Sequence, residues 1–205
     1  MAVVRVGVMG GTFDPPHKGH LAIAHEARTR LDLSCVIFVP AGQPWLKSEI
    51  SVSPAADRFE MVRLAISPYP YFKISSAEVD RLGPSYTVET LAELKADLGS
   101  GDQLFFLMGW DSLAQLPKWR QASEIIRLSC LVAVPRPGYP RPDIESMERD
   151  VPGVSGRVLF LEIPQMDISA TGIRRRVARG EPICDLVTGP VAEYIKAHGL
   201  YRSQS

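Results

Sequence analysis

The chain has 205 residues, and 23 Lys and Arg balance 23 Asp and Glu, so its formal net charge is zero. With 45% hydrophobic and 22% charged residues, the composition excludes a disordered chain, which requires low hydrophobicity and high net charge. Zero net charge argues against binding nucleic acid through bulk positive charge, and the apolar runs are far shorter than the ~20 residues that span a bilayer.

Apolar runs alternate with helical patterns along the chain, which is typical of parallel βαβ units. Strands are predicted at 3–9, 36–39, 71–74, 104–108, 130–134 and 158–161. Helices are predicted at 18–30, from Pro54 onward, at 86–98 and at 121–126. We therefore expect an α/β fold, a doubly wound parallel sheet of five or six strands, with its ligand beyond the carboxyl ends of the strands.

The remaining segments complete one predicted domain over residues 1–205, since domains average about 150 residues. Residues 136–156 are polar and rich in Pro and Gly, which favours a surface excursion. Residues 168–200 are predicted to form a C-terminal helical part.

Cysteine usage and the N-terminal pattern indicate the compartment. Cys35, Cys130 and Cys184 are widely spaced and odd in number, which favours buried, reduced thiols in a cytoplasmic protein. Arg5 and Gly7 interrupt the apolar N-terminus, so no secretory signal is expected.

The most informative segment follows the first strand, at residues 10–20, Gly-Gly-Thr-Phe-Asp-Pro-Pro-His-Lys-Gly-His. Adjacent glycines let a ligand approach the backbone closely, and the start of the next helix offers unpaired N–H groups to an anion. His17 and His20 project from the same side of that helix start. The pattern is neither a Gly-x-Gly-x-x-Gly turn nor a Walker loop. We expect contact with phosphate; a plain tight turn, or a metal site that includes Asp14, is the alternative.

A second candidate anion site lies at residues 168–174, Ile-Ser-Ala-Thr-Gly-Ile-Arg. Ser169 and Thr171 are candidate N-caps, and Arg174 follows the helix start. Taken alone, this pattern is more typical of an ordinary cap with a basic, solvated helix face.

These two blocks resemble the motifs of the nucleotidyltransferase superfamily whose signature is written (T/H)-x-G-H, here His17-Lys18-Gly19-His20. The resemblance implies a Rossmann-like fold and transfer from a nucleoside triphosphate to a phosphate-bearing acceptor, with release of pyrophosphate and without a covalent enzyme intermediate. It also implies that the late block holds the outer phosphates. Ala170 stands where many relatives have serine.

Three further segments, at 84–91, 108–111 and 116–119, are similar to the bacterial nicotinate mononucleotide adenylyltransferases, and the resemblance extends from Val4 to about Leu200. It implies that Thr87 opens a helix facing the mononucleotide and that Trp119 stacks on its pyridine ring. It also implies that Asp111 contacts the ATP ribose. From chemistry alone, a loop carboxylate and a core tryptophan remain alternatives for the last two.

Two positions depart from that family's pattern. Residues 44–47 read Pro-Trp-Leu-Lys where many members carry Pro-His-Lys, so Lys47 is expected to keep its anion role and Trp45 is not assigned the role of the histidine. Trp110 replaces a residue that is usually small.

The resemblance implies adenylyl transfer from ATP to nicotinate mononucleotide, giving deamido-NAD and pyrophosphate, with Mg²⁺ carried by ATP rather than by a protein metal site. The partners expected are these two substrates, with no nucleic acid and no membrane, and the sequence is compatible with a homo-oligomer. Alternatives are a nicotinamide-mononucleotide or phosphopantetheine adenylyltransferase and a non-catalytic nucleotide-binding protein. The expected catalytic residues are His17 and His20. The residues expected to bind ATP are these two with Gly10, Gly11, Thr12, Phe13, Asp111, Ile168, Ser169, Thr171 and Arg174. Those expected to bind the mononucleotide are Thr12, Lys47, Thr87 and Trp119.

Overall fold

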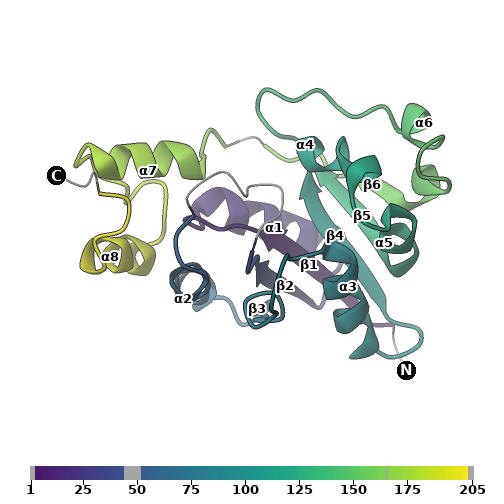
Figure 1. Ribbon diagram of the computed structural model, residues 1–205, viewed down its shortest axis with the longest axis horizontal. Coiled ribbons are helices and arrows are strands. Elements are labelled where there is room, and N and C mark those ends of the chain that lie inside the picture. The colour runs from purple at the N-terminus through teal and green to yellow at the C-terminus, as the bar shows by residue number, and fades with distance from the viewer. Residues whose placement is uncertain (1–2, 44–51, 165, 203–205) are drawn as a thin grey trace.

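The computed structural model describes residues 3–43, 52–164 and 166–202 (Figure 1). Six parallel strands form one sheet in the order β3-β2-β1-β4-β5-β6. This order reverses between β1 and β4, which places the switch point of the sheet at the ends of those two strands. The strands are β1 (Arg5–Gly11), β2 (Cys35–Pro40), β3 (Phe72–Ile74), β4 (Gln103–Gly109), β5 (Ser129–Val134) and β6 (Val158–Phe160).

Helices connect these strands, as the alternating pattern predicted, and two more follow the last strand. They are α1 (Lys18–Arg30), α2 (Ala55–Ile66), α3 (Thr87–Ala96), α4 (Trp110–Leu113), α5 (Ala122–Leu128), α6 (Ile144–Met147), α7 (Ala170–Ala178) and α8 (Gly189–Ala197), with the 3₁₀ turns η2 (Leu116–Lys118) and η3 (Val154–Arg157). The prediction of a parallel α/β sheet with C-terminal helices is confirmed, with six strands.

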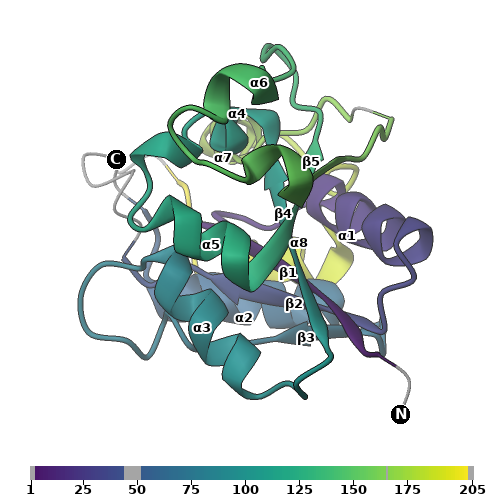
Figure 2. The ribbon, with the colours of Figure 1, turned by 90° about the vertical axis from the view of Figure 1, so that its right-hand side faces the viewer.

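Strand side chains alternate between two cores, because successive residues of a strand point to opposite faces. Met9 and Phe105 belong to a cluster that includes side chains of α1, α2, α7 and α8. Val8 and Phe106 belong to the other cluster, with side chains of α3, α4 and α5. Figure 2 shows α1 on one side of the strands and α5 on the other. The four central strands, β1, β2, β4 and β5, are covered on both faces, which explains their nearly continuous apolar sequences.

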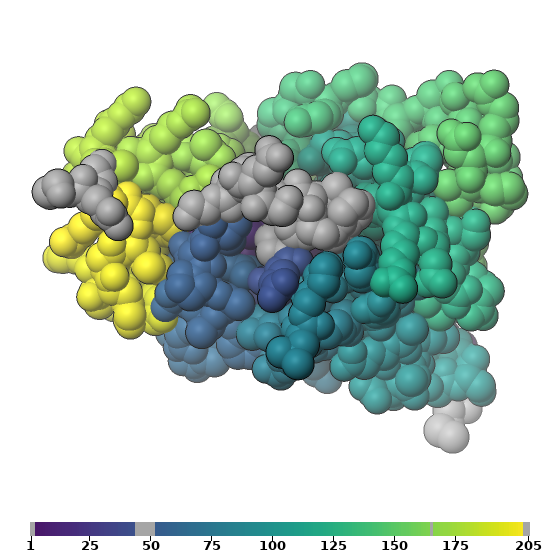
Figure 3. All heavy atoms as spheres, in the orientation of Figure 1, coloured from purple at the N-terminus to yellow at the C-terminus, as the bar shows by residue number. Residues whose placement is uncertain are grey.

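The C-terminal helices pack beside α2 at one end of the molecule (Figures 1 and 3). Ile173 of α7 and Val191 of α8 are fully buried in the same cluster as Met61 of α2. The segment after α8 is thereby brought close to the first loop, residues 12–17 between β1 and α1.

Residues 136–156 lie mostly at the surface, as predicted, but part of this segment enters the core. Met147, Val151 and Val154 are buried and complete the core on the side of α3 and α5. Three apolar residues at spacings of four and three are enough to anchor an otherwise polar segment.

The cysteine prediction holds in part. Cys35 is buried, Cys130 is half-buried and Cys184 is exposed, all with free thiols. Within the described ranges, no helix is long and apolar enough to cross a membrane.

Candidate active site

The first loop and the start of α1 form the centre of the site, at the carboxyl ends of β1 and β4. Phe13 is buried and has a left-handed φ of 49°, which is uncommon for a bulky residue and typical of a functional loop. Its ring packs edge-on against His20, with ring centroids 5.0 Å apart. The rings of His17 and His20 are stacked, with centroids 3.7 Å apart, so the two histidines do share one side of the helix start.

The contacts of these histidines define what each ring nitrogen can do. The backbone N–H of His17 donates to Nδ1 of His20 at 3.1 Å, so the proton of neutral His20 is on Nε2. Burial, together with the positive charge of Arg136, lowers the pKa of His17 to about 4, so His17 is neutral near pH 7. A Cβ on Gly19 would lie 3.0 Å from Nδ1 of His17, which explains the glycine between the two histidines.

The two motifs that are far apart in the sequence meet in the structure. Ser169 is the N-cap of α7 and accepts a hydrogen bond from the N–H of Gly172 at 3.1 Å. Arg174 donates from Nη1 to the backbone oxygen of Asp14 at 2.7 Å, across 160 positions of chain. Ile168 is half-buried against the core, and Thr171 is exposed at the start of α7. The start of α7 therefore lies beside the first loop, as a shared phosphate site requires.

A buried arginine that the sequence analysis did not select organises the loops around this centre. Arg58 of α2 is 1% exposed. It donates to the backbone oxygens of Ser53 at 2.8 Å, Thr12 at 2.9 Å and Gly42 at 3.0 Å. Burial lowers the pKa of Arg58, and the neighbouring Asp14 acts in the opposite direction. One side chain thus joins three loop segments by their carbonyl groups.

On the β4 side of the site, an acid and a base form an ion pair. Asp111, in the first turn after β4, accepts from Arg136 at 2.7 Å through Oδ2. Its other oxygen, Oδ1, is buried and has no hydrogen-bond partner in the part of the chain that the structure describes. A Cβ on Gly109 would lie 2.4 Å from that oxygen, so the glycine leaves room for the carboxylate. Oδ1 is an acceptor that a sugar hydroxyl can satisfy.

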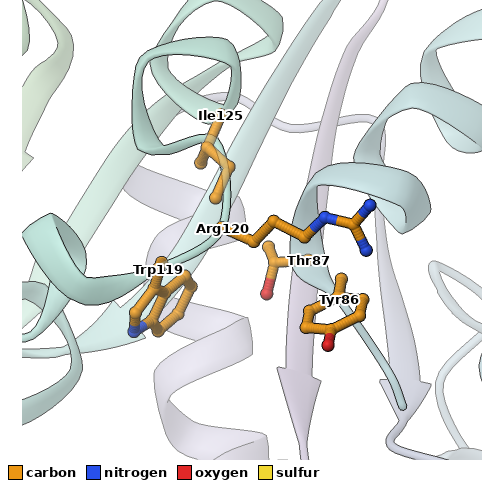
Figure 4. Close-up of a pocket in the computed structure, with 5 residues that line it drawn as sticks. All are labelled: Tyr86, Thr87, Trp119, Arg120 and Ile125. Carbon is orange, nitrogen blue, oxygen red and sulfur yellow. The ribbon is translucent and has the colours of Figure 1, made fainter.

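Thr87 and Trp119, predicted to face the same substrate, line one small pocket together with Tyr86, Arg120 and Ile125 (Figure 4). Arg120 lies over the ring of Tyr86 at 4.6 Å and pairs with Glu89 at 3.2 Å. The pocket has a volume of about 10 Å³ and is open to solvent on one side. The Trp119 ring is edge-on to Phe106 at 6.2 Å between centroids.

Of the remaining residues singled out in the sequence, some lie in the part of the chain that the structure describes and two do not. Gly10 is exposed, and Gly11 and Thr12 are half-buried, where β1 ends and the first loop begins. Lys47 and Trp45 lie outside the described residues. Trp110 packs edge-on against Phe160, with centroids 6.4 Å apart, beside the core cluster that contains Val8 and Phe106.

The structure also bears on the metal alternative for the first loop. Among residues 3–43, 52–164 and 166–202, no three His, Cys, Asp or Glu side chains are grouped so that they could hold a metal ion. Both carboxylate oxygens of Asp14 already accept hydrogen bonds, from Tyr201 at 2.6 Å and from the N–H of Ser53 at 3.3 Å.

Two of the residues that the sequence analysis missed had a detectable signal. Arg58 stands three and four positions before the buried Met61 and Val62, on the apolar face of α2. Arg136 lies two residues after the end of β5, at the carboxyl edge where ligands of such sheets bind. The third, Tyr201, follows α8 and carries no local pattern.

Comparison with known proteins places this chain in a family. Residues 8–176 match the model of the cytidylyltransferase-like family. A probable nicotinate-nucleotide adenylyltransferase of Dehalococcoides mccartyi is 47% identical over 204 residues and covers 100% of both chains. One of Saccharopolyspora erythraea is 44% identical over 200 residues, covering 98% of this chain and 91% of that protein.

Solved structures share the fold. The nicotinic acid mononucleotide adenylyltransferase of Plasmodium falciparum, complexed with NaAD, has a TM-score of 0.76 at 16% identity, over 97% of both chains. A putative nicotinate-nucleotide adenylyltransferase of Vibrio parahaemolyticus has a TM-score of 0.69 at 18% identity, over 98% of both.

The chain is therefore a member of the cytidylyltransferase-like family. Within that family, its identity over the full length of both chains places it among the nicotinate-nucleotide adenylyltransferases.

Proposed function

We propose that this protein transfers the adenylyl group of ATP to nicotinate mononucleotide, giving deamido-NAD and pyrophosphate. The observation that carries the proposal is the placement of two sites at the same edge of the sheet. The His17–His20 pair follows β1, and Trp119 of the pocket packs on Phe106 of the neighbouring β4, whose ring lies beside Gly10 of β1. A triphosphate at the first site and an aromatic mononucleotide at the second would meet at the switch point.

The chain needs no nucleophile of its own, because the acceptor phosphate attacks the α-phosphorus and pyrophosphate leaves. Catalysis is then positioning and charge stabilisation. His20 donates from Nε2 to a phosphate oxygen, since its Nδ1 is committed to the backbone N–H of His17. The N-terminus of α1 and Arg174 of α7 add positive potential on the two sides of the phosphates.

His17 is held neutral by burial and by Arg136 in the structure described here. The negative charge of a bound triphosphate opposes that shift, so substrate binding raises the pKa of His17 and strengthens it as a donor. Mg²⁺ enters as part of the substrate, coordinated by the ATP phosphates.

Asp111 is proposed to receive the ribose of ATP, since its buried Oδ1 is an unsatisfied acceptor among the described residues. Arg136, which donates to Oδ2 of the same carboxylate, orients that group and leaves Oδ1 to the sugar.

Choice of acceptor is proposed to depend on the start of α3. The first turn of this helix presents N–H groups and the positive end of the helix dipole, and Arg120 lies beside it. A carboxylate can accept from such donors, whereas the amide of nicotinamide presents an NH₂ group to them. Discrimination of at least about tenfold in kcat/KM is within reach of one charge-assisted hydrogen bond of about 1.5–3 kcal/mol.

The test is pyrophosphate release by the purified protein with ATP, Mg²⁺ and, in turn, nicotinate mononucleotide, nicotinamide mononucleotide and phosphopantetheine. Chromatography should identify deamido-NAD as the product of the first reaction. Equal use of the two pyridine mononucleotides would refute the acceptor assignment. Nucleotide binding without turnover of any acceptor would favour a binding protein instead.

A further inference from the structure

Asp14 accepts hydrogen bonds from three separate parts of the chain, two at its carboxylate and one at its backbone oxygen. Asp14 is 5% exposed. Its Oδ1 accepts from the hydroxyl of Tyr201 at 2.6 Å, and its Oδ2 accepts from the N–H of Ser53 at 3.3 Å. Its backbone oxygen accepts from Arg174 at 2.7 Å. The first loop is therefore tied to α7, to the residues before α2 and to the segment after α8.

The position of Asp14 is transmitted to the histidines over a short and stiff path. Only Pro15 and Pro16 separate Asp14 from His17, and both prolines are buried. The pyrrolidine ring fixes φ at both positions, so this segment has few ways to absorb a displacement of Asp14. His17 in turn holds His20 through its backbone N–H.

Tyr201 is well suited to hold Asp14. Burial raises the pKa of Tyr201 strongly, and its hydrogen bond to Asp14 raises it further, so the hydroxyl remains a donor at all working pH values. The positive charge of Arg58 lies close to both groups and compensates the buried carboxylate. The tyrosine is joined to the first loop only by folding, since 187 positions separate the two residues.

We propose that Tyr201 is a positioning residue of the adenylyl-transfer site, which acts through Asp14 to fix His17 and His20 against the phosphates. The proposal rests on the function proposed above. It assigns to the segment after α8 a part in the rate of the reaction beyond its part in the core.

The test replaces the hydroxyl and keeps the ring, with Tyr201→Phe. The matched control is Tyr194→Phe, because Tyr194 on α8 also donates its hydroxyl to an aspartate of another element, Asp57 of α2, at 2.8 Å. Tyr201→Phe is expected to lower kcat about tenfold with KM for ATP changed less than twofold, because small displacements at the reacting atoms act on the rate. Tyr194→Phe is expected to keep the kcat of the unmodified protein. Equal kcat values in the two variants would overturn the proposal.

A second variant asks whether Tyr201 acts through Asp14. In an Asp14→Ala background, adding Tyr201→Phe should cause no further loss of kcat, because the shared path is already broken. Losses that multiply independently would overturn the proposed path. Should Asp14→Ala fail to fold, the comparison of the two tyrosine variants decides.

A spectroscopic measurement separates this proposal from the proposed function. The chain has four histidines, so their ring Cε1–H signals can be assigned by single substitutions. Tyr201→Phe should shift the His17 signal, whereas Tyr194→Phe should shift that of His198, on which Tyr194 stacks at 3.9 Å. An unmoved His17 signal in Tyr201→Phe would refute the positioning role. Failure of the unmodified protein to form deamido-NAD would instead refute the proposed function.

Discussion

The buried guanidinium of Arg58 allows a sharp test of how the loops around the active site are held. Arg58→Met keeps an unbranched side chain of similar length but removes the charge and all the donors. Three backbone oxygens, those of Thr12, Gly42 and Ser53, then lose a charged donor. The carboxylate of Asp14 also loses its nearby compensating charge.

The expected magnitude follows from the burial of these groups. Removing one member of a buried charged cluster costs about 3–5 kcal/mol, because the remaining charge and carbonyl groups stay desolvated. For a chain of this size, 1 kcal/mol corresponds to a shift in Tm of about 2–4 °C. We therefore expect Arg58→Met to lower Tm by about 6–20 °C.

Differential scanning calorimetry measures this shift, and the same helix provides the control. Arg63 of α2 has a side chain that is 54% exposed and pairs with Glu60. Arg63→Met should change stability by no more than about 0.5 kcal/mol. Arg58→Lys keeps the charge without the planar fork and should recover only part of the loss. If Arg58→Met and Arg63→Met lower Tm equally, the role of Arg58 as the link between three loop segments is wrong.

Three further predictions concern the residues of the site. His20→Ala should lower kcat at least about 10²-fold with an unchanged circular dichroism spectrum, since removing one preorganised donor costs about 2.7–4 kcal/mol of barrier; steady-state activity within threefold of the unmodified protein would exclude His20 from the chemistry. Because the pKa of His17 is about 4 when folded and 6.5 when unfolded, the unfolded chain binds more protons between these values, and stability falls as the pH is lowered from about 6.5 toward 4. Tm measured across this pH range should depend less on pH for His17→Gln than for the unmodified protein. The same dependence of Tm on pH in both proteins would contradict the shift in the pKa of His17. Trp119→Ala should raise KM for both pyridine mononucleotides alike and leave KM for ATP nearly unchanged. A large rise in KM for ATP in initial-rate measurements would show that Trp119 belongs to the ATP site and not to the mononucleotide site.

Local sequence patterns predicted much of the architecture of this protein. The predicted helix at 18–30 has the bounds of α1, and each predicted strand is present within two residues of its observed ends. These elements can be predicted from the sequence because a strand buried on both faces is apolar along its length, and a helix packed on a sheet has an apolar stripe. The loop of residues 10–20 could be interpreted because its glycines, histidines and helix start are contiguous.

Contacts between distant segments had no such local signal. The buried role of Met147, Val151 and Val154 was missed because sparse apolar residues in a polar segment do not show which core they enter. The ion pair of Arg136 with Asp111 joins the ends of two neighbouring strands, and the pairing of those strands is a property of the sheet.

By itself, the sequence determined the class of fold, the first loop with its histidine pair, and the resemblance to an adenylyltransferase family, because each depends on residues adjacent in the chain. Only the tertiary structure decided how the loop is held. Arg174 reaches Asp14 across 160 positions and Tyr201 reaches it across 187. Such hydrogen bonds form only after the sheet and the C-terminal helices have packed, because a buried carboxylate is stable only where folding has already assembled its donors.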